Sequence, residues 1–373
     1  MSTATHHLLH RIVNRVCRVV FVGALAAVLA ASGFAGEPAV PEHFRADFLK
    51  LCDRACRELN QPTRKIAFYQ DSYAIRALAV AHDMTGKAEY LTTCREWSDR
   101  MIGFQDRMTP RGAYYMNYGR KPDAETGDWY VADCASIALA VLATAVRTDD
   151  PAARSRYFRS VESYTQLVLD NYVGPGGGIT DGLWSKFDGE WWCSSGIFAS
   201  LAFVLHQQTE KDAYRQAGLK AIDWLNRQGF RHAEHIGFKE AAPAVVMYVF
   251  EAYSAAMPYL ERGTDRYRAS LREIRDVLDW MAANQQGRGA PKTWDYASQW
   301  GSKLGGLPFH MYIYARHLPD GDTLFAAADQ ELAHIGRLLA ADAKPGLSQL
   351  TVFAMMSYAE RLRPGAMYRP RKP

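Results

Sequence analysis

The stretch YVADCASIALAVLATA, residues 130–145, carries the pattern that decides the fold. It is typical of a helix that is apolar almost all the way round, with one carboxylate, Asp133, near its head. A second stretch, YQDSYAIRALAVAHD at residues 69–83, repeats this pattern with Asp71. A helix without a polar face must be covered on every side by other parts of the chain. The two stretches therefore predict inner helices of a large helical domain.

Helices with one charged face alternate along the chain with such apolar helices, and strand-type alternation is sparse. We predict amphipathic helices at 43–60, 87–105, 152–171, 211–228, 265–284 and 323–341. We predict apolar helices at 71–84, 133–146, 195–208, 243–258, 308–318 and 347–362. This order predicts an all-α fold, an (α/α)6 barrel in which six outer helices surround six inner ones, because such repeats bury their faces only against their neighbours. A linear solenoid is the alternative, but its last repeat would need a polar cap, and LTVFAMMSYA is apolar.

The links between the predicted helices are of two kinds. Links from an inner helix to the next outer helix are short and polar, whereas the opposite links are long and rich in glycine and aromatic residues. All the long links fall at the end of the ring where the inner helices begin, so we expect the binding site there. The side chains predicted to bind substrate are Tyr73, Tyr115, Tyr118, Trp129, Tyr130, Trp191, Trp192, Ser194, Trp294 and His310.

Residues 1–35 are typical of a secretory signal peptide. A basic segment without acids precedes the apolar run 19–31, which is too short to span a bilayer comfortably, and small residues follow it. An uncleaved membrane anchor is the alternative. We expect the mature chain, 36–373, to be a single domain that is secreted or periplasmic and is not held by a membrane once the signal is removed.

Charge and cysteine content exclude other classes of protein. Of the formal net charge of +4, most belongs to Arg11, Arg15 and Arg18 in the leader, and no basic tract follows, so nucleic acid is not an expected partner. The cysteines after the leader are irregularly spaced and odd in number, which does not indicate a disulfide framework. No set of cysteines and histidines has the spacing of a zinc site.

The two aspartates have two interpretations. Aspartate is a favoured N-cap, and its charge suits the positive end of a helix dipole. A pair of carboxylates at the heads of adjacent inner helices could instead perform acid–base catalysis on a sugar, and aromatic rings nearby could stack on sugar faces. A helix N-terminus lowers a carboxyl pKa, so a proton donor there would need burial or a second carboxylate to raise it.

At these residues the chain resembles the six-hairpin glycosidases, and most of all the unsaturated glucuronyl and rhamnogalacturonyl hydrolases. Gln70-Asp71-Ser72-Tyr73-Ala74 matches the family's His-Asp-x-Gly-Phe segment, and VADCASIALAVL matches the helix headed by its second aspartate. The resemblance implies that Asp133 is the main acid/base group and Asp71 its partner. It also implies an oligosaccharide or polysaccharide substrate, hydration of an unsaturated uronyl sugar, and no metal or organic cofactor.

One departure from the family concerns the substrate's carboxylate. The family's Ser-Arg-Gly-Gln-Ala-Trp segment corresponds to WWCSSGIFASLAF, which places Ser195 at the arginine that helps to hold a uronate. If the substrate is a uronate, we expect Arg120, Lys239 or Lys303 to supply the missing positive charge.

Two other functions fit the same ring. A polysaccharide lyase needs a base and a cation, and Tyr118 with Arg120, or His235 or His310, could supply them. A non-catalytic glycan-binding protein is the other alternative, because a fold does not fix a function.

Overall fold

The computed structural model describes residues 37–62, 64, 66–116, 129–181, 189–229, 242–284, 296, 301–342 and 346–368. Tyr118 and Trp294, two of the predicted binding residues, lie outside these ranges, as do Arg120, Lys239 and His235. Residues Val40–Pro373 form one compact unit.

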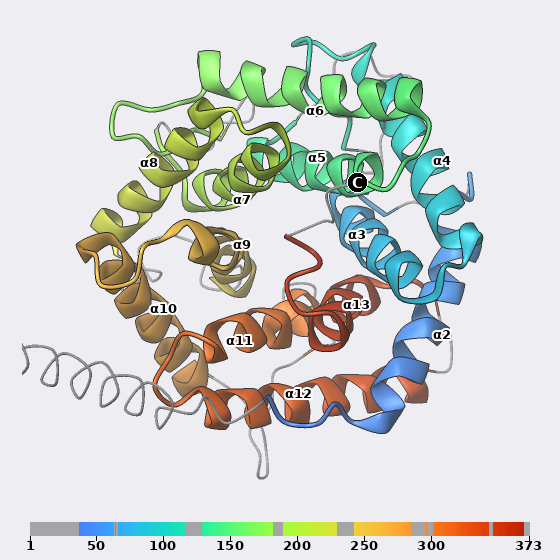
Figure 1. The fold of residues 1–373 in the computed structure, drawn as a ribbon, viewed down its shortest axis with the longest axis vertical. Coiled ribbons are helices and arrows are strands. Elements are labelled where there is room, and N and C mark those ends of the chain that lie inside the picture. Colours follow the sequence, from blue (N-terminus) through green and yellow to red (C-terminus); the bar gives the residue numbers. More distant parts are fainter. Residues whose placement is uncertain are drawn as a thin grey trace, which may run out of the picture. The chain divides into compact units, whose positions relative to one another are not determined.

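This unit is a ring of paired helices (Figure 1). The outer helices are α2 (Glu42–Glu58), α4 (Ala88–Gln105), α6 (Pro151–Asn171), α8 (Asp212–Gln228), α10 (Asp265–Asn284) and α12 (Gly321–Ala341). The inner helices are α3 (Phe68–Thr85), α5 (Val131–Ala145), α7 (Trp192–Thr209), α9 (Ala242–Ala256), α11 (Leu307–Ala315) and α13 (Gln349–Leu362). Short 3-10 helices, η2 (Met257–Tyr259) and η3 (Gly301–Gly306), follow α9 and precede α11.

The ring is closed. Each inner helix contacts the next one along the chain, and α13 returns to contact both α3 and α2. In the described part of the chain the only β pairing is two isolated bridges, Val173 with Ile179 and Thr180 with Glu190. These contacts confirm the predicted all-α (α/α)6 barrel and exclude the linear solenoid.

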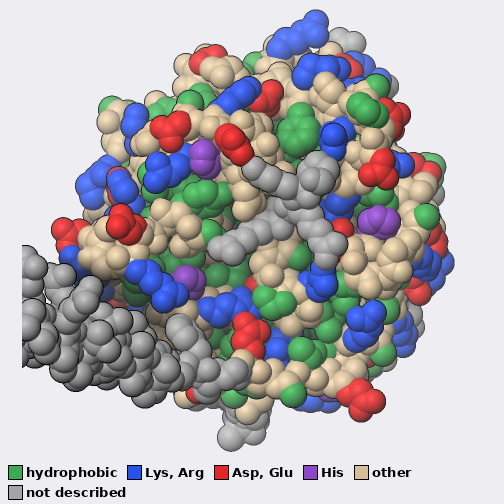
Figure 2. Space-filling model, in the orientation of Figure 1, with side chains coloured by type: hydrophobic (Ala, Val, Ile, Leu, Met, Phe, Trp, Pro, Cys, Tyr) green, Lys and Arg blue, Asp and Glu red, His purple; other side chains and the backbone are tan. Residues whose placement is uncertain are grey.

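The burial of each helix follows its sequence pattern. Every residue of α5 is buried, whereas α2 buries a single stripe that begins with Phe44, Phe48 and Leu51. Charged residues of both signs therefore lie on the outside; Figure 2 shows them interspersed around the ring. The glycine at 196 lets α7 approach α9, because a Cβ there would lie 2.5 Å from the carbonyl oxygen of Tyr248.

The first turns of the inner helices correct one sequence interpretation. The helices α3, α5 and α7 begin two or three residues earlier than predicted, and their N-caps are Ala67, Tyr130 and Trp191, none of which forms a side-chain capping bond. Asp71 and Asp133 therefore lie inside the first turn, so the N-cap interpretation of both is wrong. The aromatic residues before the helices gave no boundary signal in the sequence.

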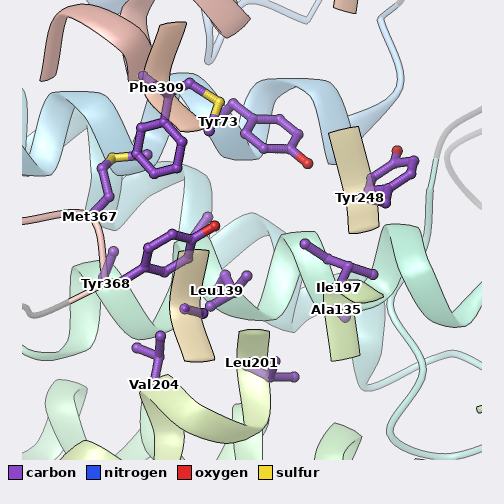
Figure 3. Packing of buried hydrophobic residues seen from close by; sticks show 14 of the residues in the cluster. Tyr73, Ala135, Leu139, Ile197, Leu201, Val204, Tyr248, Phe309, Met367 and Tyr368 are labelled. Carbon is purple, nitrogen blue, oxygen red and sulfur yellow. The ribbon is translucent and has the colours of Figure 1, made fainter. Parts of the chain in front are cut away.

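The centre of the ring is packed. Side chains from five inner helices meet there with Met367 and Tyr368, which follow α13 (Figure 3). An ion pair of 2.6 Å between Arg76 of α3 and Glu251 of α9 crosses the ring axis, and the Tyr73 hydroxyl donates to the same glutamate at 2.9 Å. Both charged side chains are almost wholly buried. Arg76 and Glu251 are the ninth and tenth residues of their helices, so this charged pair lies well inside the ring.

Candidate active site

Asp133 is the third residue of α5 and is 7% exposed. The Tyr248 hydroxyl, from α9 across the ring, donates to its Oδ1 at 3.2 Å. Burial raises the pKa of Asp133 to about 7, while the charge of Lys303 and the bond from Tyr248 act in the opposite direction. Burial therefore outweighs these opposing groups, and the carboxyl can hold or release a proton near neutral pH.

Lys303, in η3, supplies a positive charge beside this carboxyl. The side chain is buried, and its Nζ lies 5.2 Å from the ring centre of Tyr69 and 5.5 Å from that of Tyr248. Cations are attracted to the faces of aromatic rings, and more strongly when water is excluded. The ammonium group is therefore fixed between two rings and close enough to Asp133 to lower the pKa of that carboxyl.

Asp181, which the sequence analysis missed, is a second carboxyl at this place. The amide of Val131, the first residue of α5, donates to its carbonyl oxygen at 3.3 Å, and the Ser194 hydroxyl of α7 donates to its Oδ1 at 3.3 Å. Asp181 is 4% exposed. Burial raises the pKa of Asp181 to about 7, the serine opposes this, and the charge of Asp133 adds to it. The only sequence signal was an acid next to glycine in a long link.

Asp71 has different surroundings. It is fully buried, and Nε of Arg64 donates to its Oδ1 at 2.8 Å. The same arginine also donates to the carbonyl oxygen of Leu347. Burial raises the pKa of Asp71 to about 6 against the opposing effect of Arg64, and the other charges that act on it belong to Arg100 and Glu58 of outer helices. Through Arg64, Asp71 of the first inner helix is thus linked to Leu347, which precedes the last inner helix.

Helix geometry explains why Asp71 faces away from the ring axis. Tyr69 and Tyr73, at positions i and i+4 of α3, face the ring axis, where they contact Lys303 and Glu251. Asp71 lies two residues after Tyr69, which places it on nearly the opposite side of the helix, since consecutive residues are about 100° apart. The structure does not bring Asp71 to the group formed by Asp133, Asp181 and Lys303.

Three predicted aromatic residues pack within the fold. Trp129 is 0% exposed and lies edge-on to Tyr172. Tyr115 is buried between Phe68 and Phe104, and Tyr73 lies in the central polar layer described above. All three side chains are therefore part of the packed interior.

The remaining predicted residues lie at the heads of inner helices or inside the ring. Trp191 precedes α7 and is buried, while Trp192 packs edge-on against Trp224 of α8. Tyr130, half-buried, precedes α5. Ser194 contributes directly, through its bond to Asp181.

His310 lies within α11 and is buried. Its Nδ1 is 2.8 Å from the Ser254 hydroxyl, and burial, together with the charge of Arg76, lowers its pKa well below the usual value. It is therefore a neutral histidine of the interior and is not brought to Asp133.

Comparison with known structures supports the fold. No protein-family model matches the chain, and no curated protein sequence matches it. The structure is similar to the unsaturated glucuronyl hydrolase of Bacillus sp. GL1, with a TM-score of 0.57 and 13% identity over 88% of this chain and 100% of that one. It is also similar to a family 76 mannosidase of Bacteroides thetaiotaomicron, with a TM-score of 0.54 and 12% identity over 86% of this chain and 98% of that one. The chain has the six-hairpin glycosidase fold.

A second unsaturated glucuronyl hydrolase, from Streptococcus agalactiae, aligns with a TM-score of 0.55 and 9% identity over 87% of this chain and 93% of that one. In this chain's six-hairpin fold, the polar group around Asp133 lies where α5 and α7 begin. Among the described residues, no cluster of three or more histidine, cysteine, aspartate or glutamate side chains could hold a metal ion. No helix in the same ranges is long and apolar enough to cross a membrane.

Proposed function

We propose that the protein is a glycoside hydrolase that acts on oligosaccharides, with Asp133 as its acid/base group. The observation that carries this proposal is the state of Asp133: a buried carboxyl on a rigid helix, with a pKa of about 7. A carboxyl in this state can give a proton to a leaving group and take one from water at the same pH. The glycosidase fold agrees with such chemistry but does not by itself specify the reaction.

We further propose that the substrate carries an acidic sugar, such as an unsaturated uronyl residue. Lys303 is one of the three cations expected from the sequence, and it lies beside Asp133 between two tyrosine rings. An ammonium group can hold a carboxylate as a point charge, and tyrosine rings can pack on the sugar. Lys303 would thus replace the arginine that the family has at the position of Ser195.

The test is activity on a panel of lyase-generated unsaturated oligosaccharides beside the intact polysaccharides. Hydration of the double bond removes its ultraviolet absorbance, so wild-type protein should lower the absorbance and Asp133→Asn should not. A rise in absorbance with intact polysaccharide would indicate a lyase instead. Binding of oligosaccharide without turnover, unaffected by Asp133→Asn, would indicate a glycan-binding protein.

Residues 1–35 are proposed to export the protein, which would place it in the periplasm or outside the cell, where polysaccharide fragments occur. N-terminal sequencing of the protein recovered from each fraction tests this. A mature N-terminus at residue 36 in the periplasm or medium is expected, and a full-length chain in the membrane fraction would indicate the anchor instead.

A further inference from the structure

The described parts of the link between α6 and α7, residues 172–181 and 189–191, bond to the heads of two inner helices. The Ile179 amide donates to the Ser195 hydroxyl, and the Trp191 amide donates to the Ile179 carbonyl, each at 2.8 Å. Glu190 of the same link accepts bonds from the Gly178 amide at 2.8 Å and from Nε1 of Trp224 at 3.0 Å. The position of residue 181 is therefore set by contacts on both sides of it.

These contacts bring a second carboxyl to Asp133. Val131 and Ser194, the first residue of α5 and the third of α7, hold the backbone and side chain of Asp181, and Asp133 is two residues after Val131. We propose that Asp181, not Asp71, is the second catalytic carboxyl of the active site, and that Ser194 is its positioning residue. This inference rests on the proposed glycoside hydrolase function.

Two buried carboxyl groups that act on each other cannot easily both be ionised. Among the described residues, the titratable groups that interact with Asp133 include Cys134 of α5, Tyr164 of α6, Cys193 of α7 and Tyr248 of α9. The charge of Lys303 of η3, which lies beside Tyr69 of α3, favours the ionised form of Asp133. The charge of Asp133 thus favours a proton on Asp181, and a pair that holds one proton has apparent pKa values that belong to both residues.

One proton on two carboxyls is what hydrolysis of a glycosidic bond requires. The protonated carboxyl gives its proton to the glycosidic oxygen as the carbon–oxygen bond breaks, and the bonding electron pair stays on that oxygen. Water then bonds to the sugar carbon through its oxygen, and its extra proton passes to the ionised carboxyl. Hydration of an unsaturated uronyl sugar would use the pair in the same way, because the proton goes to one carbon of the double bond and the oxygen of water bonds to the other. In either reaction the pair ends with one proton, as it began, and no other reactant is needed.

The first experiment needs no substrate. Carbon-13 NMR of aspartate carboxyls, recorded against pH in the wild-type protein, should show both groups titrating near pH 7. In Asp133→Asn, the pKa of Asp181 should fall, because the charge that raises it has been removed. Asp170→Asn is the matched control, since it removes an exposed carboxyl of α6 that bonds to Gln166, and it should leave both titrations unchanged. If the pKa of Asp181 is the same in Asp133→Asn as in the wild-type protein, the two carboxyls do not interact and the inference is overturned.

The second experiment measures turnover of the lyase-generated unsaturated oligosaccharides and of phenyl glycosides. We expect Asp181→Asn to lower kcat by about 100-fold or more with its circular dichroism spectrum unchanged, as loss of an acid/base group does. Ser194→Ala should shift the pH profile with a smaller loss. Near-normal kcat in folded Asp181→Asn, while Asp133→Asn is inactive, would overturn this inference and leave the proposed function standing. No turnover by wild-type protein, with coupled titrations intact, would overturn the proposed function instead.

Discussion

The heads of α3 and α5 differ although their sequences look alike. Each has an aspartate in its first turn, before an alanine-rich apolar helix. The carboxyl of Asp133 meets a tyrosine hydroxyl, a lysine and a second carboxyl, whereas that of Asp71 forms a buried ion pair with Arg64. The comparison teaches that the phase of a helical residue, more than its motif, decides whether a carboxyl is available for chemistry or holds two hairpins together.

The largest expected effect is on catalysis. Asp133→Asn should lower kcat on the accepted oligosaccharide by about 100- to 10,000-fold, because the variant keeps the side-chain size but loses the transferable proton. Asp71→Asn should retain kcat within about tenfold and lower the melting temperature instead, since it weakens the ion pair with Arg64. Parallel measurement of kcat and melting temperature checks both. Equal losses of kcat in the two variants would mean that Asp71 and Asp133 act together, as the family resemblance implies.

The next effect is on stability at the head of α3. Arg64→Met should lower the free energy of unfolding by about 3 kcal/mol near pH 8, because it leaves the buried Asp71 carboxylate without its cation. The loss should shrink below pH 6, where the carboxyl can take up a proton. Urea denaturation at both pH values measures it, with Arg64→Lys as the charge-conserving control. A loss that does not depend on pH would mean that packing, and not the charge, matters here.

The pH dependence of stability tests the head of α5. The pKa of Asp133 is about 7 in the folded protein and ordinary in the unfolded chain, so the folded state binds more protons between roughly pH 4 and 7. Its contribution to stability is full below about pH 4 and is lost as pH rises through 7. Asp133→Asn should therefore gain stability relative to wild type on going from pH 5 to pH 8, by on the order of 2–3 kcal/mol. Identical pH profiles of the two proteins would refute the raised pKa.

The smallest effect concerns the cation. Lys303→Met should raise the KM for a uronyl oligosaccharide by about tenfold and raise the pKa of Asp133, because the ammonium favours the ionised carboxyl. Lys303→Arg is the control that keeps the charge. An unchanged KM with a raised pKa would mean that Lys303 tunes Asp133 without holding the substrate.

Much of this protein was determined by local sequence. A helix that is apolar on all sides must be an inner helix and one with a charged face must be an outer helix, so the alternation of the two predicted the ring and its hairpin order. Asp133 became a candidate for the same reason, because a charge at the head of an apolar helix stands out, and its catalytic role stays a prediction. The helix starts were misplaced because aromatic residues such as Tyr130 and Trp191 precede helices without a capping side chain.

Only the tertiary structure decided which groups meet. Asp181 and Lys303 lie in links whose course no periodicity describes. Asp181 is bonded to the heads of α5 and α7, and Lys303 lies beside Tyr69 of α3 and Tyr248 of α9, so both act on Asp133 or are acted on by it. The direction of Asp71 depends on how α3 is rotated against its neighbours, and the sequence pattern of an all-apolar helix gives no preferred side. Ring closure, which places Arg64 beside Leu347, joins residues from opposite ends of the chain, and such contacts are set by packing alone.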